Sequence, residues 1–151
     1  MIYLALLLAV ATIGGLSAVG LKVADGIQQR AAEAELIAIG GEFSRALQSY
    51  ADATPNGFPK TPESLAELLR DPRNPGIQRH LRRLYHDPLT GKADWGIVRD
   101  PERRITGIHS LSKRKTIKVA NFPEWLAVSN GGAQHRDWIF SAPTQNRPLV
   151  R

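Results

Sequence analysis

An uncharged apolar stretch, Ile2 to Leu21, limits what the N-terminal part of this chain can form. Twenty residues in a helix span about 30 Å, the thickness of the hydrocarbon core of a bilayer. A secretory signal peptide has a shorter apolar region, of about 7–15 residues, behind a positively charged start. The stretch therefore predicts a membrane helix, while the small residues from Gly14 to Ala18 leave a cleaved signal peptide as the alternative.

The helical pattern continues beyond this stretch. From Lys22 to Ala53 there is no proline, and larger apolar residues recur at intervals of three and four, which places them on one helical face. Pro55, Asn56 and Gly57 then end the pattern in a turn. We expect one helix of about 50 residues, apolar in its first half and amphipathic in its second. Its packing face comprises Leu36, Ile39, Phe43, Leu47 and Tyr50.

The residues that follow predict a small head of mixed helix and strand. Thr61 and Pro62 suit the N-cap and first position of a short helix, and its buried face would be Leu65, Leu68 and Leu69. A basic helical turn is expected over Ile77–Tyr85. It would direct Leu81, Leu84 and Tyr85 inward and Arg79, Arg82 and Arg83 outward.

A turn leads from there into a sheet. Asp87, Pro88 and Gly91 have the residue types of a tight turn, and Trp95 follows at a sheet-core position. The expected strands are Asp94–Arg99, Ile105–Ser112 and His135–Ser141, and Phe122, Pro123 and Trp125 are expected to pack a loop onto the core. The fold class is thus α+β: a long N-terminal helix, residues 1–53, carries a small antiparallel-sheet head, residues 54–151.

The chain is basic, with a net charge of +6 and a pI near 10.1, which favours anionic partners. One cluster that could bind an anion is Arg79, Arg82 and Arg83. A second joins Arg103 and Arg104 to the basic residues Lys113, Arg114, Lys115 and Lys118. Proteins that bind single strands usually add exposed aromatic residues. Since the tryptophans here have strand-like contexts, nucleic acid is not the favoured partner.

No motif predicts catalysis. His80, His86 and Asp87 lie close in sequence, but a phosphodiester site needs a placed nucleophile or metal with a second acid–base group. The sequence holds no nucleophile elbow, phosphate-binding loop or zinc-binding His-Glu-x-x-His. It has no cysteine either, which excludes disulfides and thiolate metal sites. We predict no enzyme, catalytic residue or metal ligand.

Calcium is the one cofactor worth weighing, because carboxylate oxygens are its preferred ligands. Asp87, Asp94, Asp100 and Asp137 could approach one another in a small sheet. They do not have the spacing of a calcium-binding loop, so we expect each to be solvated and the protein to need no cofactor.

Several segments, in this order, resemble the type IV pilin-like family, which includes the pseudopilins of type II secretion. The start "MIYLALLLAVATIGG" resembles a mature pilin helix, and "AELIAIGGEFSRALQSYADATP" resembles its exit. "FPKTPESLAELLRD" is similar to a segment in which pseudopilins carry an aromatic-Pro pair and a Leu-rich helix. "HLRRLYHDPLTGKADWGIV" and "ITGIHSLS" resemble the Asp-Pro turn and following strands of the major pseudopilin. The resemblance covers residues 1–112.

The resemblance implies a filament subunit inserted in the inner membrane by a single span, with its head in the periplasm. A prepilin peptidase would cut after a glycine and methylate the new N-terminus, here Met1. Subunits would then pack their helices together on an inner-membrane assembly platform to support protein secretion. The membrane and assembly residues would be Leu4, Leu7, Leu8, Ile13, Leu16 and Leu21.

Two departures from the family pattern favour a divergent or minor subunit. The Gly-Phe-Thr-Leu-x-Glu signature is absent, and Ala5 stands where a glutamate is usual if Met1 is the mature N-terminus. The tail after Ser112 also lacks the calcium-loop pattern of the major pseudopilin. Two alternatives remain: a minor pilin whose basic head binds DNA or another anionic partner, and a single-span envelope protein with an enzymatic head.

Overall fold

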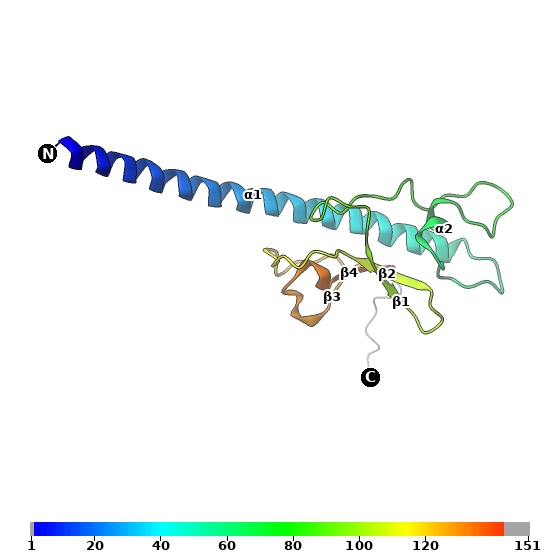
Figure 1. Ribbon diagram of the computed structural model, residues 1–151. Coiled ribbons are helices and arrows are strands. Elements are labelled where there is room, and N and C mark those ends of the chain that lie inside the picture. The colour runs from blue at the N-terminus through cyan, green and yellow to red at the C-terminus, as the bar shows by residue number, and fades with distance from the viewer. Residues whose placement is uncertain (1, 144–151) are drawn as a thin grey trace.

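The fold is α+β and is dominated by one long helix. The computed structural model describes the backbone of residues 2–143 and the side chains of Tyr3, Leu4, Leu7 and residues 25–143. Helix α1 (Ile2–Asp52) carries a short helix, α2 (Leu65–Leu69), and a four-stranded antiparallel sheet. At 1.5 Å per residue α1 is about 75 Å long. Figure 1 shows its C-terminal half lying over the sheet and its N-terminal half projecting beyond the head. The α+β class agrees with the prediction.

The sheet has the order β1-β2-β4-β3, with β1 (Gly96–Arg99), β2 (Ile105–His109), β3 (Leu126–Val128) and β4 (Trp138–Ser141). β1, β2 and β4 lie within the three predicted strands, but each is shorter than its prediction. The start of the third predicted strand is instead a short 3-10 turn, η2 (His135–Asp137), which follows η1 (Asn130–Gly132). β3 was not predicted, and it completes the sheet by pairing with β4.

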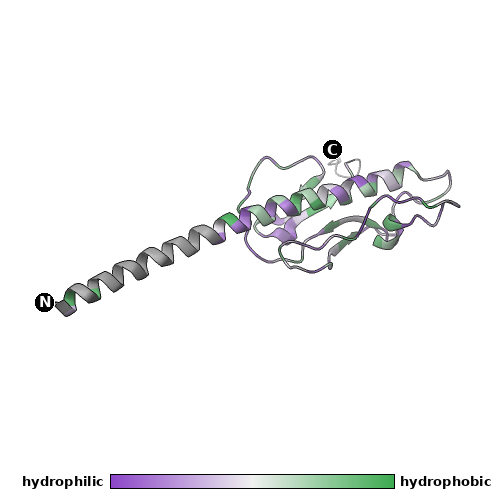
Figure 2. Ribbon diagram, turned by 90° about the horizontal axis from the view of Figure 1, so that it is seen from above, coloured by the Kyte–Doolittle hydropathy of each residue, from purple (hydrophilic) through white to green (hydrophobic). Residues whose placement is uncertain are grey.

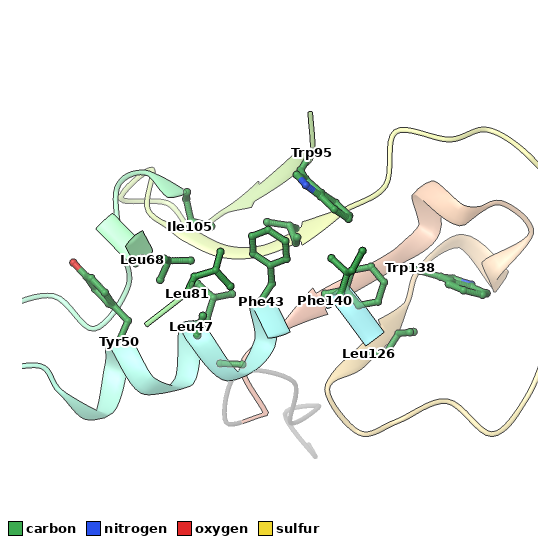
Figure 3. Packing of buried hydrophobic residues seen from close by; sticks show 14 of the residues in the cluster. Phe43, Leu47, Tyr50, Leu68, Leu81, Trp95, Ile105, Leu126, Trp138 and Phe140 are labelled. Atoms are coloured by element: carbon green, nitrogen blue, oxygen red, sulfur yellow. The ribbon is translucent and has the colours of Figure 1, made fainter. Parts of the chain in front are cut away.

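The core lies between α1 and the sheet. All five residues of the predicted packing face of α1 are buried, with Leu36 and Phe43 fully so. Figure 2 shows hydrophilic and hydrophobic residues alternating around this half of the helix. Phe43 packs against Trp95 with ring centroids 5.3 Å apart, and Phe140 lies beside the helix in Figure 3. Gly40 allows that approach, because a Cβ there would collide with the Phe140 ring.

The predicted helical turn over Ile77–Tyr85 is wrong, since the segment has an irregular backbone. The N–H groups of His80 and Leu81 both donate to the carbonyl of Leu68, at 2.9 and 2.8 Å. These bonds tie the segment to α2 and replace the i→i−4 bonds that a helix needs. Leu81 is buried as expected, whereas Leu84 is 37 % exposed and not inward.

The predicted start of the short helix is also wrong. Helix α2 begins at Leu65 after Ser64, not at Pro62. Pro62 is buried, and its carbonyl accepts a hydrogen bond of 2.7 Å from the N–H of Ile105. This bond holds the segment against β2, so the helix starts three residues later than its residue types suggest. Its buried face is as expected, with Leu68 fully buried and Leu65 and Leu69 packed on the core.

Candidate functional site

The predicted membrane and assembly residues, Leu4 to Leu21, belong to the part of α1 that precedes the head. Leu4 and Leu7 are 63 % and 67 % exposed, as is their neighbour Tyr3 at 83 %. Met1 and the side chains of Leu8, Ile13, Leu16 and Leu21 lie outside the described residues. Within the described part of the chain, no helical segment is long and apolar enough to cross a membrane.

A buried carboxylate, which the sequence analysis missed, joins α1 to the C-terminal part of the head. Glu33 is only 3 % exposed. It accepts hydrogen bonds from the backbone N–H groups of Ile117 and Lys118 at 2.7 and 3.0 Å. Nε2 of His135 lies 2.8 Å from the same carboxylate. We call these four residues the Glu33 cluster.

Hydrogen bonding decides the charge state of Glu33. Burial has the largest single influence and raises the pKa of this carboxyl. The hydrogen bonds from Ile117, His135 and Lys118 together outweigh burial, so the pKa lies below its ordinary value. Glu33 is therefore an ionised carboxylate at the contact between α1 and the head.

A second buried carboxylate, Asp71, lies at the C-terminal end of α1. Arg73 donates to both of its oxygens, from Nε at 2.9 Å and from Nη2 at 2.7 Å. Nε2 of His80 lies 3.2 Å from Asp71, and Nδ1 of His80 lies 2.9 Å from the hydroxyl of Ser49. We call Asp71, Arg73 and His80 the Asp71 cluster. The His80 side chain is only 1 % exposed.

Arg73 also completes the end of the helix. Its guanidinium donates to the carbonyl of Tyr50 at 2.9 Å and to the hydroxyl of Thr54, and it stacks 3.5 Å above the Tyr50 ring. The last carbonyls of a helix lack intrahelical partners and favour a cation. The bonds from Arg73 hold the pKa of Asp71 far below its usual range against the effect of burial. Burial and the hydrogen bond to Glu67 raise the pKa of Tyr50.

The predicted Asp-Pro turn is present, but its aspartate is not solvated. Asp87 is fully buried and accepts hydrogen bonds from the N–H of Leu89 at 2.8 Å and from the hydroxyl of Ser110 at 2.6 Å. Pro88 follows it in the turn, and Gly91 has a φ of 71°, which glycine adopts without strain. Trp95 is buried and donates to the carbonyl of Tyr85. This network builds the turn into β1.

The first predicted basic cluster lines a groove. Arg79, Arg82 and Arg83 are exposed and are joined by Arg70. The same hollow is also lined by the apolar residues Leu69, Ile77 and Leu84, and it measures about 480 Å³. We call these seven residues the arginine groove. It runs from Leu69 and Arg70 at the end of α2 to Arg83 and Leu84, which also line a hollow with Glu35 and Ile39 of α1.

The second predicted basic cluster does not form one patch. Arg103 and Arg104 precede β2, and Lys113 to Lys118 follow it, so they lie at opposite ends of that strand. Arg104 is engaged within the head, donating to the carbonyl of Thr61 at 2.9 Å and pairing with Glu63 at 2.8 Å. Arg114 lies 3.7 Å from Asp25 of α1. Only Arg103 of the first pair is exposed.

Among the described residues, no three His, Asp or Glu side chains gather in a way that could hold a metal ion. Of the four aspartates considered for calcium, Asp87 and Asp137 are buried in hydrogen bonds within the head, which contradicts their expected solvation, and Asp94 is exposed. Asp100 accepts from the N–H of Arg104 in the loop between β1 and β2.

Comparisons with known proteins give this chain no relative. No family model matches its sequence, no curated protein is similar to it, and no solved structure matches its fold.

Proposed function

We propose that this chain is a structural subunit of a pilin-like filament, of the type II secretion pseudopilus or type IV pilus kind. It would be held in the inner membrane by one span, with its head in the periplasm, and then assemble through its N-terminal helix. The observation that carries this proposal is the shape of the molecule. The head is fastened to α1 from Asp25 onward, and the preceding helical residues project beyond it (Figure 1).

The size and composition of the projecting part support the proposal. Residues 2–24 of a helix measure about 35 Å, slightly more than the hydrocarbon core of a bilayer. The part of it without charge, Ile2 to Leu21, is long enough to need an apolar environment, which a bilayer or the same segment of neighbouring subunits can supply. Gly14, Gly15 and Gly20 in its sequence are residues that permit close approach of helices.

The attachment of the head supports it as well. The Glu33 cluster and the Asp71 cluster fasten the head near the two ends of the same helical face. Ser44 adds a bond of 2.7 Å to the carbonyl of Ser141 between them. A head held at several points moves together with its helix. The head and helix can therefore be added to a filament as one rigid subunit.

The test is cysteine crosslinking of the full chain in its native membrane. The chain has no cysteine, so the variant Leu7→Cys carries a single thiol on the projecting helix. We expect oxidation to give disulfide-linked dimers, and a bifunctional amine-reactive reagent to give a ladder of higher multimers. The matched control is Val119→Cys, which is 82 % exposed on the head and should give few disulfide-linked dimers.

A protein that stays monomeric in both variants would contradict the proposal and leave a plain single-span membrane protein. The intact mass of the native protein adds an independent result. An N-methylated Met1 derived from a longer precursor would place the chain among peptidase-processed subunits, whereas an unmodified translation start would remove that support.

A second candidate function is capture of an anionic partner by the head, as a minor pilin-like subunit would do. The arginine groove favours it, because its four arginines make no ion pair among the described residues.

A further inference from the structure

The arginine groove combines unmatched positive charge with exposed apolar surface. Arg70, Arg79, Arg82 and Arg83 are all exposed. Elsewhere in the described chain Arg45, Arg73, Arg104 and Arg114 each have a carboxylate partner, whereas Arg30, Arg99, Arg103 and Arg136 have none; the groove differs from these in gathering four such arginines in one place. Glu35 of α1 shares a neighbouring hollow with Arg83 but forms no ion pair with it. The groove is therefore electrostatically incomplete.

The apolar part of its lining is open to solvent. Ile77 is 74 % exposed and Leu84 is 37 % exposed, although a branched aliphatic side chain gains about 1.5–3 kcal/mol from full burial. The backbone next to Leu84 also has N–H groups that are free to bind a ligand. Residues 82–86 donate no backbone hydrogen bond within the described structure, whereas most buried and many exposed N–H groups are paired.

We propose that the arginine groove binds an acidic segment of a partner protein, in which residues with carboxylates alternate with aliphatic ones. Carboxylates would pair with the guanidinium groups, which are suited to bidentate contacts. The aliphatic side chains would cover Ile77 and Leu84. An extended segment would present the two kinds of side chain alternately on its two sides. The proposal deepens the second candidate function and does not depend on filament assembly.

The groove suits a peptide better than a phosphate-bearing ligand. Nucleic-acid grooves usually add aromatic side chains on which bases stack, and the lining here has none. The ring of Tyr85, the residue after Leu84, is already covered by Arg83 at 5.0 Å. A membrane is disfavoured by position, because the groove is lined by residues 69–84 of the head, which is fastened to α1 from Asp25 onward, and not by the projecting residues proposed to enter the bilayer.

The test measures binding of an acetylated, amidated Glu-Leu-Glu-Leu-Glu peptide to the full chain in detergent micelles by calorimetry. We expect saturable binding that weakens as salt is raised. The variant Arg79→Gln, Arg82→Gln, Arg83→Gln should weaken it by about ten-fold or more. The control variant Lys60→Gln, Lys92→Gln, Lys113→Gln changes three exposed cations outside the groove and lowers the net charge equally, so it should retain binding.

Two further measurements separate specific recognition from general attraction. Ile77→Ser should weaken binding by about five-fold, and a peptide with Gln in place of Glu should not bind. The proposal is overturned if the acidic peptide shows no saturable binding, or if the control variant weakens it as much as the groove variant. It is equally overturned if a single-stranded oligonucleotide or phosphatidylglycerol vesicles bind more tightly at the same salt and lose binding in the groove variant.

Discussion

The head is fastened to α1 by two buried carboxylate clusters that differ in how they are built. The Asp71 cluster is local: Asp71, Arg73 and His80 lie within ten residues of one another and close the C-terminal end of the helix. The Glu33 cluster is long-range, because His135 lies 102 positions from Glu33. Both carboxylates accept from backbone N–H and lie against an imidazole, but only Asp71 also pairs with a guanidinium.

This difference in partners has consequences for stability. A guanidinium keeps its charge over the whole accessible pH range, so Asp71 always faces a cation. The imidazole of His135 is charged only when protonated, so Glu33 depends more on its backbone donors. A buried carboxylate that loses a permanent cation is left with an uncompensated charge. The Asp71 cluster should therefore be the more costly of the two to break.

The largest effect is expected for Arg73→Ala. The Arg73 side chain is 6 % exposed and that of Asp71 is fully buried. Removing the guanidinium leaves a buried carboxylate without its permanent cation and takes a donor from the helix end, which should lower the free energy of unfolding by about 3–5 kcal/mol. Urea unfolding followed by tryptophan fluorescence measures this change. Arg79→Ala, at an exposed arginine, is the control and should stay within about 0.5 kcal/mol of the parent.

The apolar contact between the two clusters gives the next effect. A Cβ at Gly40 would enter the ring of Phe140, so Gly40→Ala must move either the ring or the helix. Overpacking of this kind typically costs about 1–3 kcal/mol, and we expect the upper end. The control is Gly26→Ala, where a Cβ would meet no atom within 4 Å. Because alanine is the better helix former, that variant should not be destabilised.

Breaking the Glu33 cluster should cost less. Glu33→Gln keeps one acceptor oxygen but replaces the other, which accepted a hydrogen bond, by an NH₂ donor. We therefore expect the free energy of unfolding to fall by about 2 kcal/mol. The local consequence is more specific. One of the two amides, that of Ile117 or that of Lys118, loses its acceptor and should exchange hydrogen faster, which mass spectrometry of the corresponding peptide detects. If hydrogen exchange at residues 117 and 118 were unchanged while exchange near Asp71 became faster, Glu33 would not be the group that holds these two amides.

These two clusters mark where sequence reasoning succeeds and where it stops. The periodicity of Leu36, Phe43 and Tyr50 was sufficient to predict the buried face of α1. Glu33 lies three residues before Leu36, on the same face, and this position was the available signal for its burial. Its partner could not be found in the same way, because no local pattern links residue 33 to residue 135.

The head shows the same limit. The Asp-Pro turn and the strands around it have strong local signals, and the structure has β1, β2 and β4 in those places. The strand β3 has three residues, too few to show an alternating pattern. The basic segment after Gly76 has helical spacing of its leucines, but bonds to the carbonyl of Leu68 decide its backbone. Tertiary hydrogen bonds therefore override the local preference for helix both in Ile77–Tyr85 and at the start of α2.

The smallest effect is a difference in acid sensitivity between matched variants, Glu33→Gln and Asp71→Asn. The folded pKa of each carboxyl is lowered, so each stabilises the fold above its ordinary pKa and loses that contribution as pH falls through the folded value. The ordinary values are 4.5 for Glu33 and 3.8 for Asp71, and the pKa of Asp71 is lowered much further. Urea titrations at falling pH should therefore show the cost of Glu33→Gln fading first, starting near pH 4.5, while the cost of Asp71→Asn persists to a lower pH. If the cost of Asp71→Asn faded first, Arg73 would not be the group that holds Asp71 ionised, and the contrast between the two clusters would be wrong.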